Sequence, residues 1–139
     1  MARVLGVDVG TARVGLALSD PAGITAQPLE VIEGEGPTGF VAAVAERARE
    51  LDVEEIVVGI PLRMNGARGP AAEAAEAFAR SLEDASGLPV QRWDERLSTK
   101  QAERAMRTAG ANARRQRGVV DKVAAALVLG AYLDAKRPR

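Results

Sequence analysis

Three acidic residues stand in unusually apolar parts of this sequence. Asp8 interrupts the aliphatic run of residues 4–9, Glu95 follows the short apolar segment 90–93, and Asp121 lies in the most hydrophobic stretch of the chain. An ionised carboxylate in such a setting costs several kcal/mol unless it is paired, hydrogen-bonded or bound to a cation. Converging carboxylates also repel one another unless a divalent cation lies between them. The three acids together therefore favour a shared cation site.

Each acid taken alone has a simpler interpretation. Asp8 could cap the turn that begins at Gly10, Glu95 could pair with Arg96 or Arg13, and Asp121 could start a helix, where the helix dipole favours an acid. Asp94 also stands beside Glu95. Strand alternation points adjacent side chains to opposite faces, so one of the two should enter the site, and the pattern leaves open which.

The composition narrows the chemistry to oxygen ligands. The 139 residues (14.6 kDa) include no Cys and no His, which excludes disulfides, Cys-ligated zinc, thiol nucleophiles, Ser-His-Asp triads and nucleases with a His base. Hard carboxylate sites suit Mg²⁺ or Mn²⁺. Two such ions roughly 3.5–4 Å apart can hold a phosphodiester, activate a water and stabilise the leaving oxygen. Aromatic residues make up 3% of the chain, so stacking on bases is poorly supplied.

The basic residues gather in the C-terminal third. Residues 1–90 hold 7 basic and 14 acidic side chains, residues 91–139 hold 12 and 5, and the two parts therefore carry −7 and +7. Such a bias fits an anionic partner such as nucleic acid, or simply a solvated surface. The candidate phosphate contacts are Arg96, Lys100, Arg104, Arg107, Arg114, Arg115 and Arg117, with Thr11, Arg13, Arg63 and Asn65 in loops at the rim of the same cleft.

The apolar patterns predict one α/β domain over residues 1–139. The predicted elements are two hairpin strands (4–9 and 14–18), a Pro-interrupted edge strand (24–33), a helix (38–51), a strand (55–60), a loop (61–69), a helix (70–85), a strand (90–93), a helix (98–108), a loop (110–118) and a last, buried helix (119–133). This order predicts a mixed sheet, antiparallel in its first strands and parallel afterwards, flanked by helices. No run approaches the roughly 20 apolar residues that span a bilayer, so a cytoplasmic protein with no membrane partner is expected.

Several of these segments resemble a known family. The segments are Gly6–Gly15, Ile56–Leu62 with Asn65-Gly66, Asp94-Glu-Arg-Leu-Ser-Thr99, and Asp121-Lys122 with Ala124-Ala125. In this order they resemble the YqgF/RuvX family, bacterial relatives of the RuvC Holliday-junction resolvase with an RNase H-like fold. The Asp-Glu-Arg-Leu-Ser-Thr block is the most specific part.

The resemblance implies a metal-dependent nuclease, acting as an endo- or exonuclease. It implies that Asp8, Glu95 and Asp121 are catalytic residues that bind the metal, and it selects Glu95 over Asp94. No fourth acid of the kind that RuvC uses is evident, which leaves the ligands of a second ion open. The family is associated with processing the 5′ end of pre-16S rRNA, in ribosome biogenesis, and with cutting branched DNA in recombination. The implied partner is structured RNA or branched DNA, and an isologous homodimer would suit a two-fold junction.

Two other functions remain open at this stage. The chain could be a non-catalytic RNA-binding factor of ribosome assembly that keeps the fold and the acids. The motif Asp8-Val-Gly-Thr11 also resembles the phosphate loop of actin-like ATPases and sugar kinases. Those enzymes close two such domains over ATP, whereas this chain has room for one.

Overall fold

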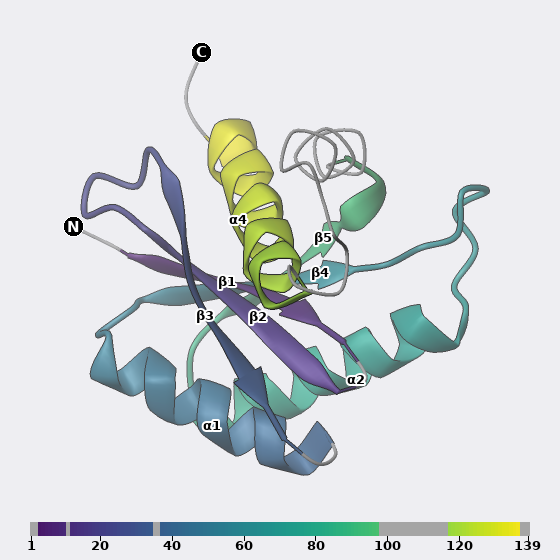
Figure 1. The fold of residues 1–139 in the computed structure, drawn as a ribbon, viewed down its shortest axis with the longest axis horizontal. Coiled ribbons are helices and arrows are strands. Elements are labelled where there is room, and N and C mark those ends of the chain that lie inside the picture. The colour runs from purple at the N-terminus through teal and green to yellow at the C-terminus, as the bar shows by residue number, and fades with distance from the viewer. Residues whose placement is uncertain (1–2, 11, 35–36, 98–116, 137–139) are drawn as a thin grey trace.

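Five strands form one mixed sheet with the order β3-β2-β1-β4-β5 (Figure 1). The structure is a computed structural model, and it describes residues 3–10, 12–34, 37–97 and 117–136. The elements are β1 (Val4–Val9), β2 (Arg13–Ser19), β3 (Ala26–Glu33), α1 (Pro37–Glu50), β4 (Glu55–Ile60), α2 (Pro70–Ser86), β5 (Val90–Asp94), the 3-10 turn η1 (Glu95–Leu97) and α4 (Arg117–Lys136).

The first strands are antiparallel and the later ones parallel, as predicted. β1 pairs with β2 as a hairpin, in the register Asp8 opposite Gly15, and with β4 in parallel. β4 pairs in parallel with β5, and β3 forms an antiparallel edge beside β2. The mixed sheet follows from the chain order, because a short turn can join antiparallel neighbours whereas parallel neighbours need a crossover helix. Helices α1 and α2 supply those crossovers.

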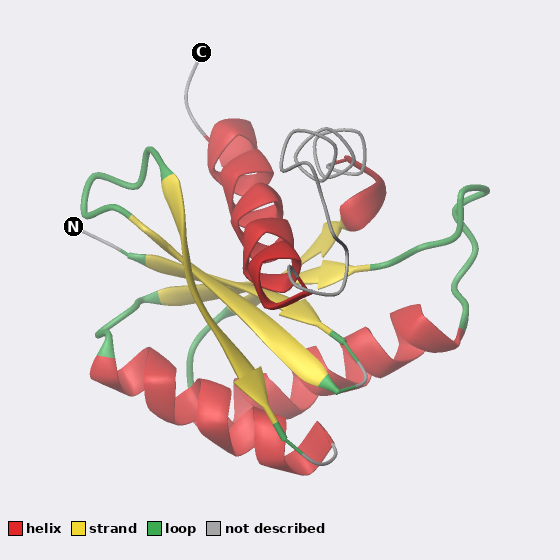
Figure 2. Cartoon of the chain, in the orientation of Figure 1, coloured by secondary structure: helices red, strands yellow, loops and turns green. Residues whose placement is uncertain are grey.

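The helices cover the two faces of the sheet unequally (Figures 1 and 2). One face packs on α1 and α2 through the larger core, which includes Leu5, Val7 and Val58. The other face packs on α4 through a smaller core that includes Val57 and Leu129. Side chains alternate along each strand, so β1 contributes to both cores.

Helix α4 runs antiparallel to β1 and β4, and its direction is fixed by contacts at two points. A Cβ on Gly6 would lie 2.7 Å from Leu129 Cβ and 3.1 Å from the Ala125 carbonyl oxygen, so Gly6 lets the helix approach the sheet closely. Nearer the end of α4, the Tyr132 hydroxyl donates to Glu55 Oε2 at 2.9 Å, and Glu55 is the first residue of β4. The beginning of α4 therefore lies toward the carboxyl ends of β1 and β4.

Most predicted elements are confirmed, and the differences lie in the C-terminal region. The predicted helix 98–108 and residues 110–116 of the predicted loop lie outside the described residues. Helix α4 begins at Arg117, two residues before the predicted start, and the prediction that it is buried all round is wrong. Ala125, Val128, Leu129 and Leu133 are buried, whereas positions between them are half-exposed, because a single helix covers this face and no further described element packs outside it. Among the described helices, none has the length and apolarity needed to cross a membrane.

Candidate active site

Asp8 occupies the central strand of the sheet, on the face covered by α4. Gly6 faces α4, and strand alternation puts Asp8, two residues further along β1, on the same face. Its neighbour on β2 is Gly15. On β4, Gly59 follows Val58, which lies beside Val7 in the parallel register, so Gly59 is the next position along toward Asp8. The carboxyl thus stands in a row of small residues that leaves room above the sheet.

Glu95 reaches this row from the end of β5. It is the first residue of η1, and its side chain lies directly over Gly59: a Cβ on that glycine would be 2.6 Å from Glu95 Oε1 and 2.8 Å from Glu95 Cγ. From there the Glu95 carboxyl is hydrogen-bonded to the carboxyl of Asp8. Two carboxyl groups can make such a bond when they share a proton, so residues 87 positions apart in the sequence meet at one point.

The electrostatics of the pair favour a cation. Burial, the hydrogen bond to Asp8, and the negative charges of Asp8 and Asp94 together raise the pKa of Glu95 from 4.5 to about 9. Burial is the largest of these causes. A cavity of about 430 Å³ adjoins Glu95, and apolar side chains such as Phe40 and Phe78 dominate its lining. Without a metal, the pair therefore retains a proton at neutral pH. A bound cation would take the place of that proton.

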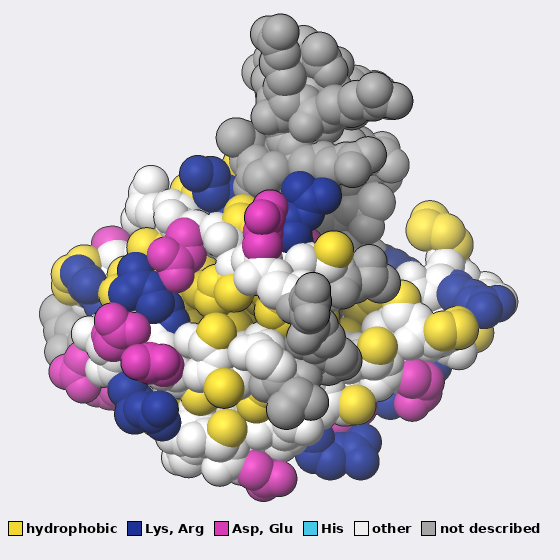
Figure 3. All heavy atoms as spheres, turned by 60° about the horizontal axis from the view of Figure 1, so that its bottom comes forward, with side chains coloured by type: hydrophobic (Ala, Val, Ile, Leu, Met, Phe, Trp, Pro, Cys, Tyr) yellow, Lys and Arg dark blue, Asp and Glu magenta, His cyan; other side chains and the backbone are white. Residues whose placement is uncertain are grey.

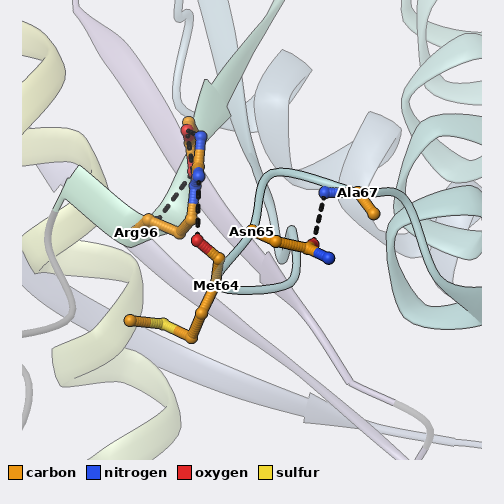
Figure 4. Close-up of polar contacts among 5 residues, drawn as sticks. Met64, Asn65, Ala67 and Arg96 are labelled. Atoms are coloured by element: carbon orange, nitrogen blue, oxygen red, sulfur yellow. Dashed lines mark hydrogen bonds and ion pairs between the residues drawn. The ribbon is translucent and has the colours of Figure 1, made fainter.

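Asp94, the other candidate, is engaged elsewhere. Its carboxylate accepts from Arg96 Nε at 3.0 and 3.1 Å, from Arg96 Nη2 at 2.7 Å and from the Arg96 backbone N–H at 2.9 Å (Figure 4). These bonds lower the pKa of Asp94, which is the opposite direction from Glu95. The structure thus brings Glu95, and not Asp94, to Asp8, and Arg96 pairs with Asp94 and not with Glu95.

The backbone of Asp121 lies at the same end of the sheet. Position 121 precedes Ala125 and Leu129 by one and two helical turns, so it falls on the side of α4 that faces the sheet. Because α4 is antiparallel to β1, position 121 lies beyond Gly6 in the direction of Asp8. The side chain of Asp121 is outside the part that the structure describes. Within the described side chains, no group of three acids is close enough to hold a metal.

The structure describes only some of the residues that were predicted to contact nucleic acid. Arg96 has its guanidinium on Asp94 and on the Met64 carbonyl oxygen, the latter at 3.4 Å, so its described contacts are within the protein. Asn65 Oδ1 accepts from the Ala67 backbone N–H at 2.9 Å and so shapes the loop that follows β4 (Figure 4). Arg63 is exposed in the same loop, and Arg13 opens β2. Thr11, Lys100, Arg104, Arg107, Arg114 and Arg115, and the side chain of Arg117, lie outside the described part.

Over the described surface of the α1 and α2 side, basic and acidic side chains are interspersed (Figure 3). Among them, Arg92 on β5 pairs with Glu76 and Glu83 of α2, at 3.1 and 2.7 Å. These pairs join β5, the strand that precedes Glu95, to a crossover helix, so Arg92 serves the fold.

Gly59 is the site residue that the sequence-based reasoning missed. Its signal was present, because a glycine inside the apolar strand Ile56-Val-Val-Gly-Ile60 weakens the strand and often marks the close approach of another group. Nothing in the local pattern says that the approaching group is the side chain of Glu95, which lies 36 residues away.

Comparison with known proteins agrees with this geometry. The family model of RuvX, described as "Holliday junction resolvase", matches residues 2–135. A relative from Moorella thermoacetica named "Putative pre-16S rRNA nuclease" is 50% identical over 132 residues, covering 95% of this chain and 94% of that protein. A relative of the same name from Syntrophus aciditrophicus is 47% identical over 133 residues, covering 96% of this chain and 89% of that protein.

Solved structures show the fold independently. T. thermophilus RuvC in complex with a Holliday junction substrate superposes with a TM-score of 0.64 at 20% identity, covering 100% of this chain and 99% of that chain. A second T. thermophilus RuvC structure gives a TM-score of 0.57 at 17% identity, covering 96% and 95%. The fold is therefore RNase H-like, of the RuvC type. Together with the match over nearly the whole sequence, this shows that the chain belongs to the RuvX family of nucleases.

Proposed function

We propose that this protein is a metal-dependent nuclease that hydrolyses phosphodiester bonds in structured nucleic acid. The observation that carries the proposal is the convergence of the Asp8 and Glu95 carboxyl groups at the carboxyl ends of the central strands. A protein gains nothing in stability from two acids held together in this way, and such pairs are typical of catalytic sites.

The donor set fits a hard divalent cation. Asp8 and Glu95 offer only carboxylate oxygens, and the two carboxyl groups converge above the sheet. Asp121 is proposed as the third ligand, since its backbone approaches from α4. A bound Mg²⁺ or Mn²⁺ supplies the charge that neutralises a phosphate and an activated water. The two-ion arrangement stays a prediction, and the ligands of a second ion stay open.

The residues of the chain perform the remaining tasks. Gly59 makes room for the Glu95 side chain above the sheet, and Gly15, the neighbour of Asp8 on β2, adds no side chain beside Asp8. Arg13 and Arg63, at the strand ends around this space, are proposed to bind the flanking phosphates, which positions the backbone without reading sequence. Shape of the nucleic acid would then determine which bond is cut.

The names of the relatives direct the choice of substrate. The curated relatives are named for pre-16S rRNA, so we propose maturation of the 5′ end of this RNA as the activity to test first, in the cytoplasm. Cutting of a four-way DNA junction is the second activity to test, because the family description names it.

Both activities can be tested with one set of variants. Purified protein with Mg²⁺ or Mn²⁺ is expected to cut a pre-16S rRNA 5′ fragment, and Asp8→Asn, Glu95→Gln and Asp121→Asn are each expected to abolish cutting. Asp84→Asn is a matched control, since Asp84 is exposed on α2 at the other face of the sheet. Tight RNA binding by the wild type without cleavage under either ion would overturn the proposal in favour of a non-catalytic assembly factor.

A further inference from the structure

We propose that Gly59 and the Asp94–Arg96 ion pair are positioning residues that hold the Glu95 carboxyl against Asp8. In this arrangement Arg96 serves the site from inside the protein and makes no contact with nucleic acid. The inference rests on the proposed function, because it assigns a purpose to residues around one of the proposed metal ligands.

The Glu95 side chain packs directly on the backbone of Gly59. Three atoms of the Glu95 side chain, Oε1, Cγ and Cδ, lie 2.6, 2.8 and 3.0 Å from the position that a Cβ on residue 59 would occupy. Real Cβ atoms essentially never approach other atoms within 3.0 Å. The backbone of Gly59 is in an ordinary strand conformation, so the requirement for glycine here comes from space alone. Any larger residue would lift the Glu95 carboxyl off the sheet and away from Asp8.

The Asp94–Arg96 pair fixes Glu95 from both sides along the chain. Asp94 accepts from the backbone N–H of Arg96, which closes a tight turn around Glu95, and the guanidinium binds both oxygens of the same carboxylate. The two side chains are 23% and 35% exposed, so the pair is partly sheltered from solvent. A turn closed in this way limits the directions in which the Glu95 side chain can leave the backbone.

Arg96 also ties this turn to the loop that follows β4. Its Nη1 donates to the Met64 carbonyl oxygen at 3.4 Å, a long bond (Figure 4). The guanidinium also lies against Gly66, which has a positive φ of 86°. The donors Nε, Nη1 and Nη2 thus all have acceptors within the protein. A phosphate would have to displace the carboxylate of Asp94 to be bound in the same bidentate manner.

The need for glycine under Glu95 is tested by comparing Gly59→Ala with Gly39→Ala. Gly39 lies in α1 with nothing within 4 Å of the added methyl, so it controls for the loss of a glycine. Gly59→Ala is expected to lower Mn²⁺ affinity in calorimetry by about 10–100-fold, the range for residues that orient metal ligands, while Gly39→Ala leaves it unchanged. Wild-type affinity in a folded Gly59→Ala protein would overturn the proposal.

The ion pair is tested with a double-mutant cycle that does not depend on a core substitution. Asp94→Asn, Arg96→Met and the double variant are expected to lower kcat and Mn²⁺ affinity by about the same factor of ten, with KM unchanged, because each breaks the same pair. The proposal is overturned if Arg96→Met raises KM and flattens its salt dependence while Asp94→Asn has no effect, since that result marks a phosphate contact.

Failure of the nuclease proposal would be recognised separately. If the wild-type protein neither cuts nucleic acid nor binds Mn²⁺, the proposed function fails. Crystal structures of Gly59→Ala and Gly39→Ala then still test the positioning role. Loss of the Glu95–Asp8 contact in Gly59→Ala alone supports that role, and retention of the contact overturns it.

Discussion

Replacing Glu95 by Gln is expected to stabilise the metal-free protein at neutral pH while abolishing its activity. The pKa of Glu95 is raised from 4.5 to about 9 in the folded chain, so the folded state binds a proton that the unfolded state has released. The free energy of unfolding therefore falls as pH rises from about 4.5 to 9, and below 4.5 the loss disappears, because both states are protonated. Gln cannot ionise, and its amide N–H₂ can still donate to Asp8.

The magnitude follows from the same shift. A pH of 7 is about 2.5 units above the pKa of Glu95 in the unfolded chain. At 1.36 kcal/mol per unit, the folded state therefore loses roughly 3 kcal/mol of its free energy of unfolding by keeping the proton. Glu95 is only partly buried and is coupled to Asp8, so water and coupling reduce this figure, and we expect about 1–3 kcal/mol. For a domain of this size that is a rise in Tm of roughly 3–10 °C.

Urea unfolding in EDTA at about pH 5, 7 and 9 measures the effect. The wild type should lose stability across this series, and Glu95→Gln should lose less and be the more stable protein at pH 7 and above. Asp84→Asn is the control, because Asp84 is exposed on α2 at the other face of the sheet, so this variant removes a carboxyl away from the Asp8–Glu95 pair. The reasoning is refuted if Glu95→Gln is the less stable protein at pH 7 or keeps the wild-type slope.

Three further outcomes are expected. Mg²⁺ or Mn²⁺ should raise the Tm of the wild type more at pH 8 than at pH 5, because protons compete with the metal for the carboxylates, and EDTA should reverse the rise. An equal rise in Tm for Glu95→Gln would contradict metal binding by Glu95. Gly6→Ala should cost about 1–3 kcal/mol in urea unfolding, because the methyl would lie 2.7 Å from Leu129 Cβ; an unchanged midpoint would contradict the packing of α4. Tyr132→Phe should cost about 1 kcal/mol, since Glu55 loses the hydroxyl donor, and the same loss in a Glu55→Met background, which has no acceptor for that hydroxyl, would point to another cause.

The sequence predicts most of the framework because its local signals are strong. The hairpin, the strand 55–60 and helix α2 were predicted within a residue or two, since short apolar runs and the Pro70 and Gly87 boundaries specify them locally. The burial of α4 was predicted wrongly. An Ala-rich helix looks apolar all round in sequence, and its small side chains tolerate the half-exposed positions that a one-helix layer leaves.

The site was only partly predictable for a different reason. That acids should converge follows from their apolar settings, but the choice between Asp94 and Glu95 came from the family resemblance. The physical basis of that choice is non-local, because it depends on Gly59 in another strand and on the side to which Arg96 folds. The role of Asp121 and of the basic residues 100–117 stays a prediction.

The position of α4 also bears on when the protein becomes active during its synthesis. This helix is the last described element to leave the ribosome, and until it docks, the sheet face that contains Val57 has no cover. The docking that buries this face is also the event that brings position 121 toward Asp8. On the proposed assignment, a growing chain could fold its sheet and crossover helices and still lack a complete set of metal ligands. On the same assignment, the protein would gain the ability to cut nucleic acid only after translation had passed α4.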